Sequence, residues 1–238
     1  MTHSGGKPAE AQGGVLYLVP TPLGNLRDIT LRAMDILTGA TVIAAEDTRR
    51  TGQLLKLLGL ERAGRMVSYH EHNEARRSSE LVAGLASGES VALVTNAGMP
   101  SISDPGYRLV RAAIESGARV EALPGASVVT AALAGSGLPT DRFAFLGFMP
   151  KKPGARGRFM TDAAVRVETV VFFESAERLG RTLAEASGHF GVEREAVVCR
   201  ELSKLHEEFA RGTLEELAAR YGEKKPRGEI TVLVAGKS

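Results

Sequence analysis

The densest group of residues able to bind a ligand lies between Thr95 and Gly106, after the apolar run SVALV and before the amphipathic stretch YRLVRAAIESG. These twelve residues, TNAGMPSISDPG, are rich in glycine, proline, serine, asparagine and aspartate. Ligands of open α/β sheets bind beyond the carboxyl ends of strands, and loops of this length are usually functional. We therefore expect this loop to contact a ligand. The alternative is a structural Ω-loop capped by Asp104.

Two further loops follow predicted strands. The first runs from Pro20 to Asn25 after VLYLV, and its prolines and glycine fix a rigid bend that lets a ligand approach the backbone. An ordinary turn from strand to helix is the alternative. The second, Pro124 to Ser127, precedes the small-residue stretch VVTAALAGSG. Amide groups at the start of that helix are able to bind a carboxylate or phosphate, whereas close helix packing explains the small residues equally well.

The segment from Glu46 to Arg50 begins a predicted helix after the apolar run TVIAA. Its acidic residues, Glu46 and Asp47, suit the positive end of a helix dipole. A capping role and a role in binding a substrate therefore both stay open for this segment.

Two clusters of basic residues lie in the second half of the chain. The segment KKPGARGR contains four positive charges and no negative one, and a second group lies close to the last predicted strand. Such clusters suit a phosphate backbone and make binding dependent on salt, but they also occur on solvated surfaces. The two clusters comprise Lys151, Lys152, Arg156 and Arg158, and Lys224, Lys225 and Arg227.

Several common sites are excluded or disfavoured. The chain has neither the dinucleotide motif G-x-G-x-x-G nor the phosphate-binding motif G-x-x-x-x-G-K-S/T. His70 and His72 are two residues apart, which is not the helical spacing of a zinc site, so we expect no metal. The single cysteine, Cys199, excludes internal disulfides.

The composition bounds the class of protein. With 238 residues, of which 43% are hydrophobic and 24% charged, the chain is long enough to bury one large core or two smaller ones. Aromatic residues make up 5% and tryptophan is absent, which disfavours a module that stacks RNA bases. The net charge is only +2. No apolar run approaches the ~20 residues that span a bilayer, and no signal-peptide core is evident, so we expect a soluble, cytoplasmic protein.

Short apolar runs alternate with amphipathic stretches from Val15 onwards, which predicts a mostly parallel sheet between helices. Thr30 is placed to cap the first of these helices. Residues 1–14 are polar and glycine-rich, and we expect a disordered tail there. Near Leu138 the sequence becomes rich in glycine and proline. We therefore predict an N-terminal α/β domain over 15–137 and a C-terminal α/β domain with a mixed sheet over 138–238.

Eight motifs in a fixed order closely resemble the small-subunit ribosomal RNA ribose 2′-O-methyltransferases of the tetrapyrrole methylase superfamily. They are VPTPLGNLRDIT, AAEDTRRTG, VTNAGMPSISDPGYRLV, ALPGASVVTAAL, SGLPTDRFAFLGFMP, FFESAERL, CRELSKLHEE and GEITVLV. The resemblance implies two α/β domains with S-adenosylmethionine in a cleft between them, and a homodimer. It also implies methylation of the ribose 2′-hydroxyl of a cytidine in the decoding region of small-subunit ribosomal RNA.

The same resemblance assigns roles to particular residues. Lys204 and Glu201 are the first candidates for catalysis, because a coupled lysine and carboxylate tune each other's pKa, although an ion pair that only holds the domain together is an equal alternative. The expected cofactor residues are Pro20, Asn96, Ala97, Gly98, Ser101, Ile102, Thr130, Ala131, Gly228, Glu229 and Ile230. The expected substrate residues are Glu46, Asp47, Arg49, Lys151, Lys152, Arg156, Arg158 and Glu174.

The chain departs from the family pattern in the cofactor loop. Where Ser-Asp-Ala-Gly-Thr-Pro is expected, it has Thr-Asn-Ala-Gly-Met-Pro from Thr95 to Pro100. Loss of the carboxylate at Asn96 is expected to weaken cofactor binding roughly ten- to a hundredfold, because a hydrogen bond to a charged group contributes ~1.5 to 3 kcal/mol.

Two other functions are compatible with the sequence. A methyltransferase that acts on a tetrapyrrole has the same fold, and the acidic side chains of its substrate would also suit the basic clusters. A noncatalytic RNA-binding protein of ribosome assembly is compatible with the altered cofactor loop. The two motifs that include AEDTR and RELSK favour the RNA methyltransferase.

Overall fold

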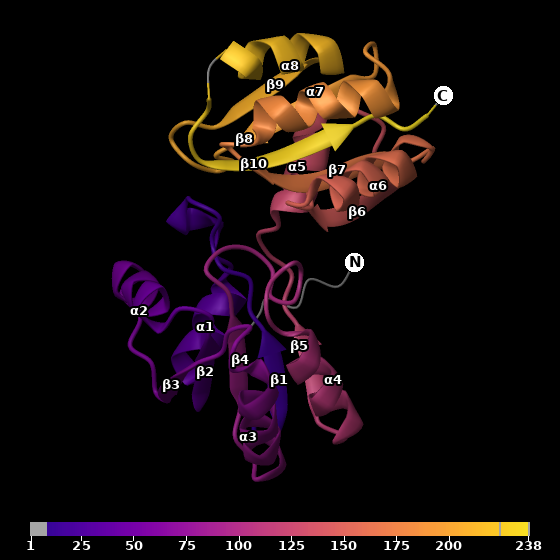
Figure 1. The fold of residues 1–238 in the computed structure, drawn as a ribbon. Coiled ribbons are helices and arrows are strands. Elements are labelled where there is room, and N and C mark those ends of the chain that lie inside the picture. Colours follow the sequence, from indigo (N-terminus) through magenta and orange to yellow (C-terminus); the bar gives the residue numbers. More distant parts are fainter. Residues whose placement is uncertain (1–8, 224, 238) are drawn as a thin grey trace. The chain divides into compact units, whose positions relative to one another are not determined.

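A computed structural model describes residues 9–223 and 225–237. The chain divides into two compact units between Ser127 and Val128, each with its own sheet (Figure 1). The sequence instead suggests a boundary between 137 and 138. The difference comes from helix α5 (Val128–Ser136), whose buried Val129, Ala132 and Leu133 pack in one cluster with strands of the second sheet. Burial of this apolar face assigns the helix to the second unit.

The first unit is built on a five-stranded sheet in the order β3-β2-β4-β1-β5, and all pairings between its strands are parallel. Its strands are β1 (Val15–Leu18), β2 (Val42–Ala45), β3 (Arg65–Ser68), β4 (Val91–Val94) and β5 (Arg119–Ala122). Its helices are η1 (Leu26–Asp28), α1 (Leu31–Gly39), α2 (Thr48–Leu57), α3 (Glu74–Ala86) and α4 (Tyr107–Glu115). The predicted parallel sheet is confirmed.

Helices cover both faces of this first sheet. Along β1, Val15 and Tyr17 belong to one core cluster and Leu16 and Leu18 to another, as expected because successive side chains of a strand point to opposite faces. Helices α1 and α2 contribute to the first cluster, and α3 and α4 contribute to the second. Thr30 caps α1 as predicted, since its side chain accepts a hydrogen bond from the amide of Ala33.

Residues 1–8 of the predicted tail lie outside the described residues, whereas residues 9–14 are described and contact the first unit. Ala9 and Ala11 pack against the first core cluster. The amide of Ala9 donates a 2.9 Å hydrogen bond to Asp35, and that of Gln12 donates a 2.9 Å bond to the hydroxyl of Tyr17.

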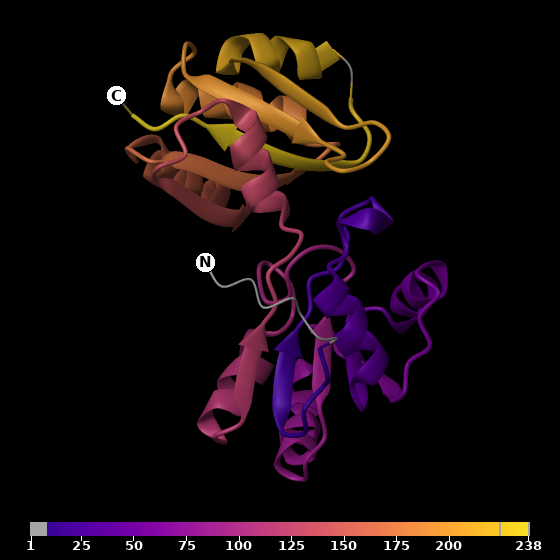
Figure 2. The same cartoon turned by 180° about the vertical axis from the view of Figure 1, so that it is seen from behind.

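The second unit contains a mixed sheet, as predicted, in the order β6-β7-β10-β8-β9. Strands β6 and β7 are parallel, and every other neighbouring pair is antiparallel. Helices α6, α7 and α8 cover one face, and α5 lies on the other (Figure 2). The strands are β6 (Phe143–Phe148), β7 (Thr169–Ser175), β8 (Glu195–Arg200), β9 (Glu208–Thr213) and β10 (Glu229–Val234), and the remaining helices are α6 (Pro153–Ala164), α7 (Leu179–Phe190) and α8 (Leu214–Glu223).

No helix in the described ranges is both long and apolar enough to cross a membrane.

Candidate functional site

The three loops singled out in the sequence meet at the carboxyl end of the first sheet. Thr21 and Gly98 form an isolated antiparallel bridge, with N···O distances of 3.0 and 2.9 Å. The hydroxyl of Thr21 also donates a 3.0 Å hydrogen bond to the carbonyl of Thr95. The third loop touches the first, because a Cβ atom at Gly125 would lie 2.8 Å from that of Pro20. The three loops, chosen because ligands of open α/β sheets bind beyond the carboxyl ends of strands, therefore form one connected loop cluster.

Glu46 joins this cluster from the neighbouring strand. It directly follows β2, and its Oε2 accepts a 3.0 Å hydrogen bond from the backbone amide of Asn96. A carboxylate thus holds the backbone of the second loop at the position where the chain departs from the family pattern.

The second loop carries buried polar atoms that lack a partner. The Oδ1 atom of Asn96 and the Oγ atom of Ser101 are buried without a hydrogen bond from any described residue. Ser101 and Ser103 also adopt positive φ angles of 70° and 62°, which are uncommon for residues other than glycine. An unsatisfied buried polar group costs ~1 to 3 kcal/mol, so the loop is suited to a ligand that brings polar groups of its own.

Asp104, considered above only as the cap of a structural loop, is a further candidate. Helix α4 starts after Gly106 and has no side-chain cap, so Asp104 does not cap this helix. Burial, reinforced by the charge of Glu46, raises the pKa of Asp104 to about 6. Ionisable groups with shifted pKa values concentrate at functional sites. The sequence feature that indicates Asp104 as a candidate is its place in a long loop after a buried strand.

A small cavity of about 170 Å³ opens beside the loop cluster. The first loop, α2 and the start of the second loop enclose it. It is lined by Pro22, Gly24, Leu26, Arg50, Thr51, Leu54, Thr95 and Asn96.

Asp47 caps helix α2. Its Oδ1 accepts hydrogen bonds from the amides of Arg50 and Arg49, at 3.2 and 2.9 Å, and these two bonds lower the pKa of the Asp47 carboxyl. The capping interpretation of this residue is therefore confirmed. The side chain of Arg49 is exposed.

In the second unit, Glu201, Lys204 and Glu229 form one charged cluster. The Nζ atom of Lys204 lies 2.9 Å from Glu201 and 3.0 Å from Glu229. The amide of Glu229 donates a 2.9 Å bond to the carboxylate of Glu201. That backbone bond, followed by the bond from Lys204, lowers the pKa of Glu201. Partial burial opposes the charge on Lys204, but its hydrogen bonds to both carboxylates outweigh this and raise its pKa.

The remaining cofactor candidates of this unit differ in exposure. Thr130 and Ala131 lie on the exposed side of α5, and Gly228 precedes β10 beside the carboxylate of Glu201. Ile230 is 3% exposed and belongs to the core cluster under α6, α7 and α8, so its side chain is unavailable to a ligand. The structure therefore gives no support for a contact between the Ile230 side chain and the cofactor.

Glu174, expected on the substrate side, is buried at the end of β7. Its carboxylate accepts hydrogen bonds from the amide of Ser175 at 2.6 Å and from the hydroxyl of Thr182 at 2.5 Å, and it pairs with Arg178 at 2.5 Å. These contacts position Arg178, which also donates to the carbonyls of Met149 and Pro150. Arg178 belongs to the motif FFESAERL but was not among the residues expected at the site.

Arg156, one of the four basic residues expected to bind substrate, is paired within the fold. It is 3% exposed, and its guanidinium forms a bidentate pair with Glu185, with distances of 2.5 and 2.7 Å. It is thus a buried structural cation and not a contact for phosphate. Lys151, Lys152 and Arg158 are exposed. In the second cluster Lys225 and Arg227 are exposed, while Lys224 lies outside the described residues.

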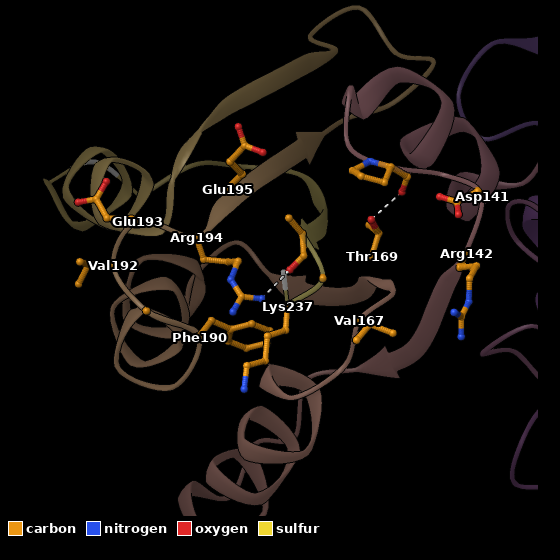
Figure 3. A pocket seen from close by; sticks show the side chains of 14 residues that line it. Asp141, Arg142, Val167, Thr169, Phe190, Val192, Glu193, Arg194, Glu195 and Lys237 are labelled. Atoms are coloured by element: carbon orange, nitrogen blue, oxygen red, sulfur yellow. Dashed lines mark hydrogen bonds between the residues drawn. The ribbon is translucent and has the colours of Figure 1, made fainter.

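A cavity of about 860 Å³ opens at the end of the second sheet where β6, β7 and β8 begin (Figure 3). Thr169 and Arg194 in its wall are engaged with backbone carbonyls, those of Pro139 and Ala235. Among the residues that the structure describes, no predicted site residue lines this cavity, and Glu174 and Glu201 lie at the opposite end of the strands.

Across residues 9–223 and 225–237, no group of three or more histidine, cysteine or acidic side chains is arranged to hold a metal ion. Cys199 is buried, and burial raises the pKa of its thiol to about 12, so the nucleophilic thiolate form is disfavoured.

Comparisons with known proteins agree with these observations. The family model of Tetrapyrrole (Corrin/Porphyrin) Methylases matches residues 15–218. The chain is 47% identical over 228 residues to a protein from Micromonospora olivasterospora named ribosomal RNA small subunit methyltransferase I, covering 95% of this chain and 72% of that protein. It is 45% identical over 223 residues to a protein of the same name from Synechocystis, covering 94% and 79%.

Solved structures share the fold. The crystal structure of uroporphyrin-III-C-methyltransferase from Thermus thermophilus is 24% identical, with a TM-score of 0.63, and the match covers 93% of this chain and 94% of that one. A cobalt precorrin-4 methyltransferase is 18% identical, with a TM-score of 0.68, covering 93% and 95%. At these identities the similarity establishes the architecture alone.

Proposed function

Since this chain belongs to the tetrapyrrole methylase family and to its ribosomal RNA small subunit methyltransferase I branch, we propose that it transfers a methyl group from S-adenosylmethionine to small-subunit ribosomal RNA. The observation that carries the proposal is near-half identity to relatives of that name over 95% of the chain. We propose the ribose 2′-hydroxyl of a cytidine in the decoding region as the acceptor, because eight motifs resemble those of the ribose methyltransferases in the same order, with the departure at Asn96 and Met99 described above.

The loop cluster of the first unit suits the cofactor. Asn96 and Ser101 carry buried polar atoms without partners, and S-adenosylmethionine brings amino, carboxylate and hydroxyl groups able to pair with such atoms. Ala97, Gly98 and Ile102 complete the proposed binding loop. Pro20 packs against Gly125 of the third loop. When bound, the cofactor supplies an electrophilic methyl group on a sulfonium.

The proton state of Lys204 defines its proposed role. Because Glu201 and Glu229 hold its ammonium charged, Lys204 is a poor proton acceptor at neutral pH. We assign it the role of a cation that favours loss of the proton from a bound hydroxyl, and Glu201 the role of fixing that cation. Both residues belong to the motif CRELSKLHEE.

The resemblance also supports a homodimer that works in the cytoplasm, where small ribosomal subunits are made. Light scattering on the purified protein tests the first point, with twice the 25.2 kDa chain mass as the expected result.

The proposal is tested by supplying labelled S-adenosylmethionine with small ribosomal subunits in one reaction and with a porphyrinogen in another. We expect label in the ribosomal RNA only. Label in the porphyrinogen would instead identify a tetrapyrrole methyltransferase. Binding of subunits without any transfer would identify a noncatalytic RNA-binding protein.

A further inference from the structure

Strand β6 contains an irregularity that determines where its last aromatic residue points. The pairing of β6 with β7 shifts register between Phe145 and Phe148, and Gly147 in that interval has a φ of +71°. Regular alternation would place Phe145 and Phe148 on opposite faces of the sheet. A bulge adds one residue and returns the second side chain to the face of the first, and glycine adopts the required left-handed conformation without strain.

The bulge builds a three-ring cluster. Phe145 and Phe148 both pack against Phe173 of β7, with centroid distances of 4.9 and 5.1 Å and interplanar angles of 60° and 63°. Phe145 and Phe173 are half-buried against the core cluster that includes α5. Phe148 lies at the edge of the cluster with 63% of its surface exposed. The ring is therefore held by its neighbours while leaving most of its area open.

Two unpaired lysines follow Phe148 closely in the sequence. Lys151 and Lys152 are exposed and form no ion pair with any residue in the described ranges. Three residues of chain span at most about 10 Å, so Lys151 lies close to Phe148. No acidic residue occurs between Phe148 and Arg158.

The position of the lysines is unfavourable for the fold itself. They immediately precede α6, whose amino-terminal dipole disfavours positive charge and favours anions. A phosphate group at this position would relieve the repulsion, since it would bring negative charge to the two lysines and to the positive end of the helix dipole.

We propose that Phe148, Lys151 and Lys152 form a platform for one unpaired nucleotide of an RNA substrate, with the base on the Phe148 ring and the phosphate on the two lysines. The inference rests on the proposed function, because it names a contact with the same substrate. Unpaired bases are commonly bound by stacking on aromatic rings beside cations. The low aromatic content excludes a module with many stacking rings, but a single supported ring is enough for one base.

The absence of tryptophan from the chain permits a direct test. Phe148→Trp introduces a single tryptophan that both preserves stacking and reports on it. Phe143→Trp is the matched control, because Phe143 lies at the other end of the same strand and is 45% exposed. On titration with a short single-stranded RNA of mixed sequence, we expect the fluorescence of the Phe148→Trp protein to be quenched and that of the control to stay constant.

Affinity measurements complete the test. Phe148→Ala should weaken RNA binding roughly 5- to 150-fold, whereas Phe148→Trp should retain the wild-type affinity. Replacing both lysines by alanine should lower the slope of log K against log salt by about 1 to 2. RNA binding by Phe148→Trp without quenching would overturn the platform. Quenching that needs no RNA and grows with protein concentration would also overturn it, because a second copy would then cover the ring.

The test of the platform can fail independently of the test of methyl transfer. A wild-type protein that methylates small subunits, combined with an unquenched Phe148→Trp variant, refutes the platform alone. Quenching by RNA in a protein that transfers no methyl group supports the platform and refutes the proposed activity.

Discussion

Replacement of Asp104 by asparagine is expected to stabilise the protein above pH 6. The carboxyl group lies in the loop cluster, where burial and the charge of Glu46 raise its pKa from 3.8 to about 6. The folded state therefore binds the proton more tightly than the unfolded chain. In such a case the free energy of unfolding falls as pH rises from about 4 to 6 and then stays constant, because above pH 6 both states are ionised.

The size of the effect follows from the shift. A difference of about 2 pKa units corresponds to about 3 kcal/mol. Since the Asp104 side chain is partly exposed, solvent screening reduces this to about 1 to 2 kcal/mol. The asparagine of the variant has nearly the same shape as the aspartate and no charge, so the penalty disappears. At pH 4 the aspartate is protonated in the folded state and about 40% protonated in the unfolded one, so the variant should be more stable by only about 0.5 kcal/mol.

Urea unfolding followed by circular dichroism at pH 8 and pH 4 measures the difference. The matched control is Glu61→Gln, an exposed acid of the same unit whose loss should change stability by less than about 0.5 kcal/mol. Equal stability of the Asp104→Asn and wild-type proteins at pH 8, or a gain of the same size at both pH values, would refute the reasoning.

Three further outcomes are expected. Asn96→Asp restores the family carboxylate and should tighten S-adenosylmethionine binding roughly ten- to a hundredfold by calorimetry; an unchanged Kd would count against a role for this side chain. Glu185→Ala leaves Arg156 buried and unpaired and should lower the free energy of unfolding by about 3 to 5 kcal/mol, whereas Glu115→Ala, which breaks an exposed pair, should cost less than about 1 kcal/mol in the same urea assay. Lys204→Arg should retain methyl transfer and Lys204→Met should lose it, because the proposed role needs only a cation; an inactive Lys204→Arg would favour proton transfer instead.

Local patterns predicted most of the architecture. Alternation of short apolar runs with amphipathic stretches indicated the parallel first sheet, and adjacent strands without helices indicated the mixed second one. Thr30 was recognisable as a cap because capping depends on neighbouring residues only. The position of α5 was not predictable in this way, since its small residues suit packing on either sheet and burial against the second sheet depends on distant strands.

The contact between the three loops of the candidate site was predictable from the sequence, but the contacts of individual side chains were not. The rule that ligands bind at strand ends brought Pro20 and Asn96 into one cluster. The ion pair between Arg156 and Glu185 was not predictable, because a run of basic residues does not indicate which of them pairs with an acidic residue on another helix. Phe148 escaped for a similar reason, since its exposure depends on a bulge and on a partner ring in β7.

The most direct test of the central claim is transfer of labelled methyl from S-adenosylmethionine to small ribosomal subunits taken from a strain that lacks this protein, followed by nuclease mapping of the label. The account predicts label on the ribose of a single cytidine in the decoding region. Label on a base, or no label from a protein that binds the cofactor, would contradict it.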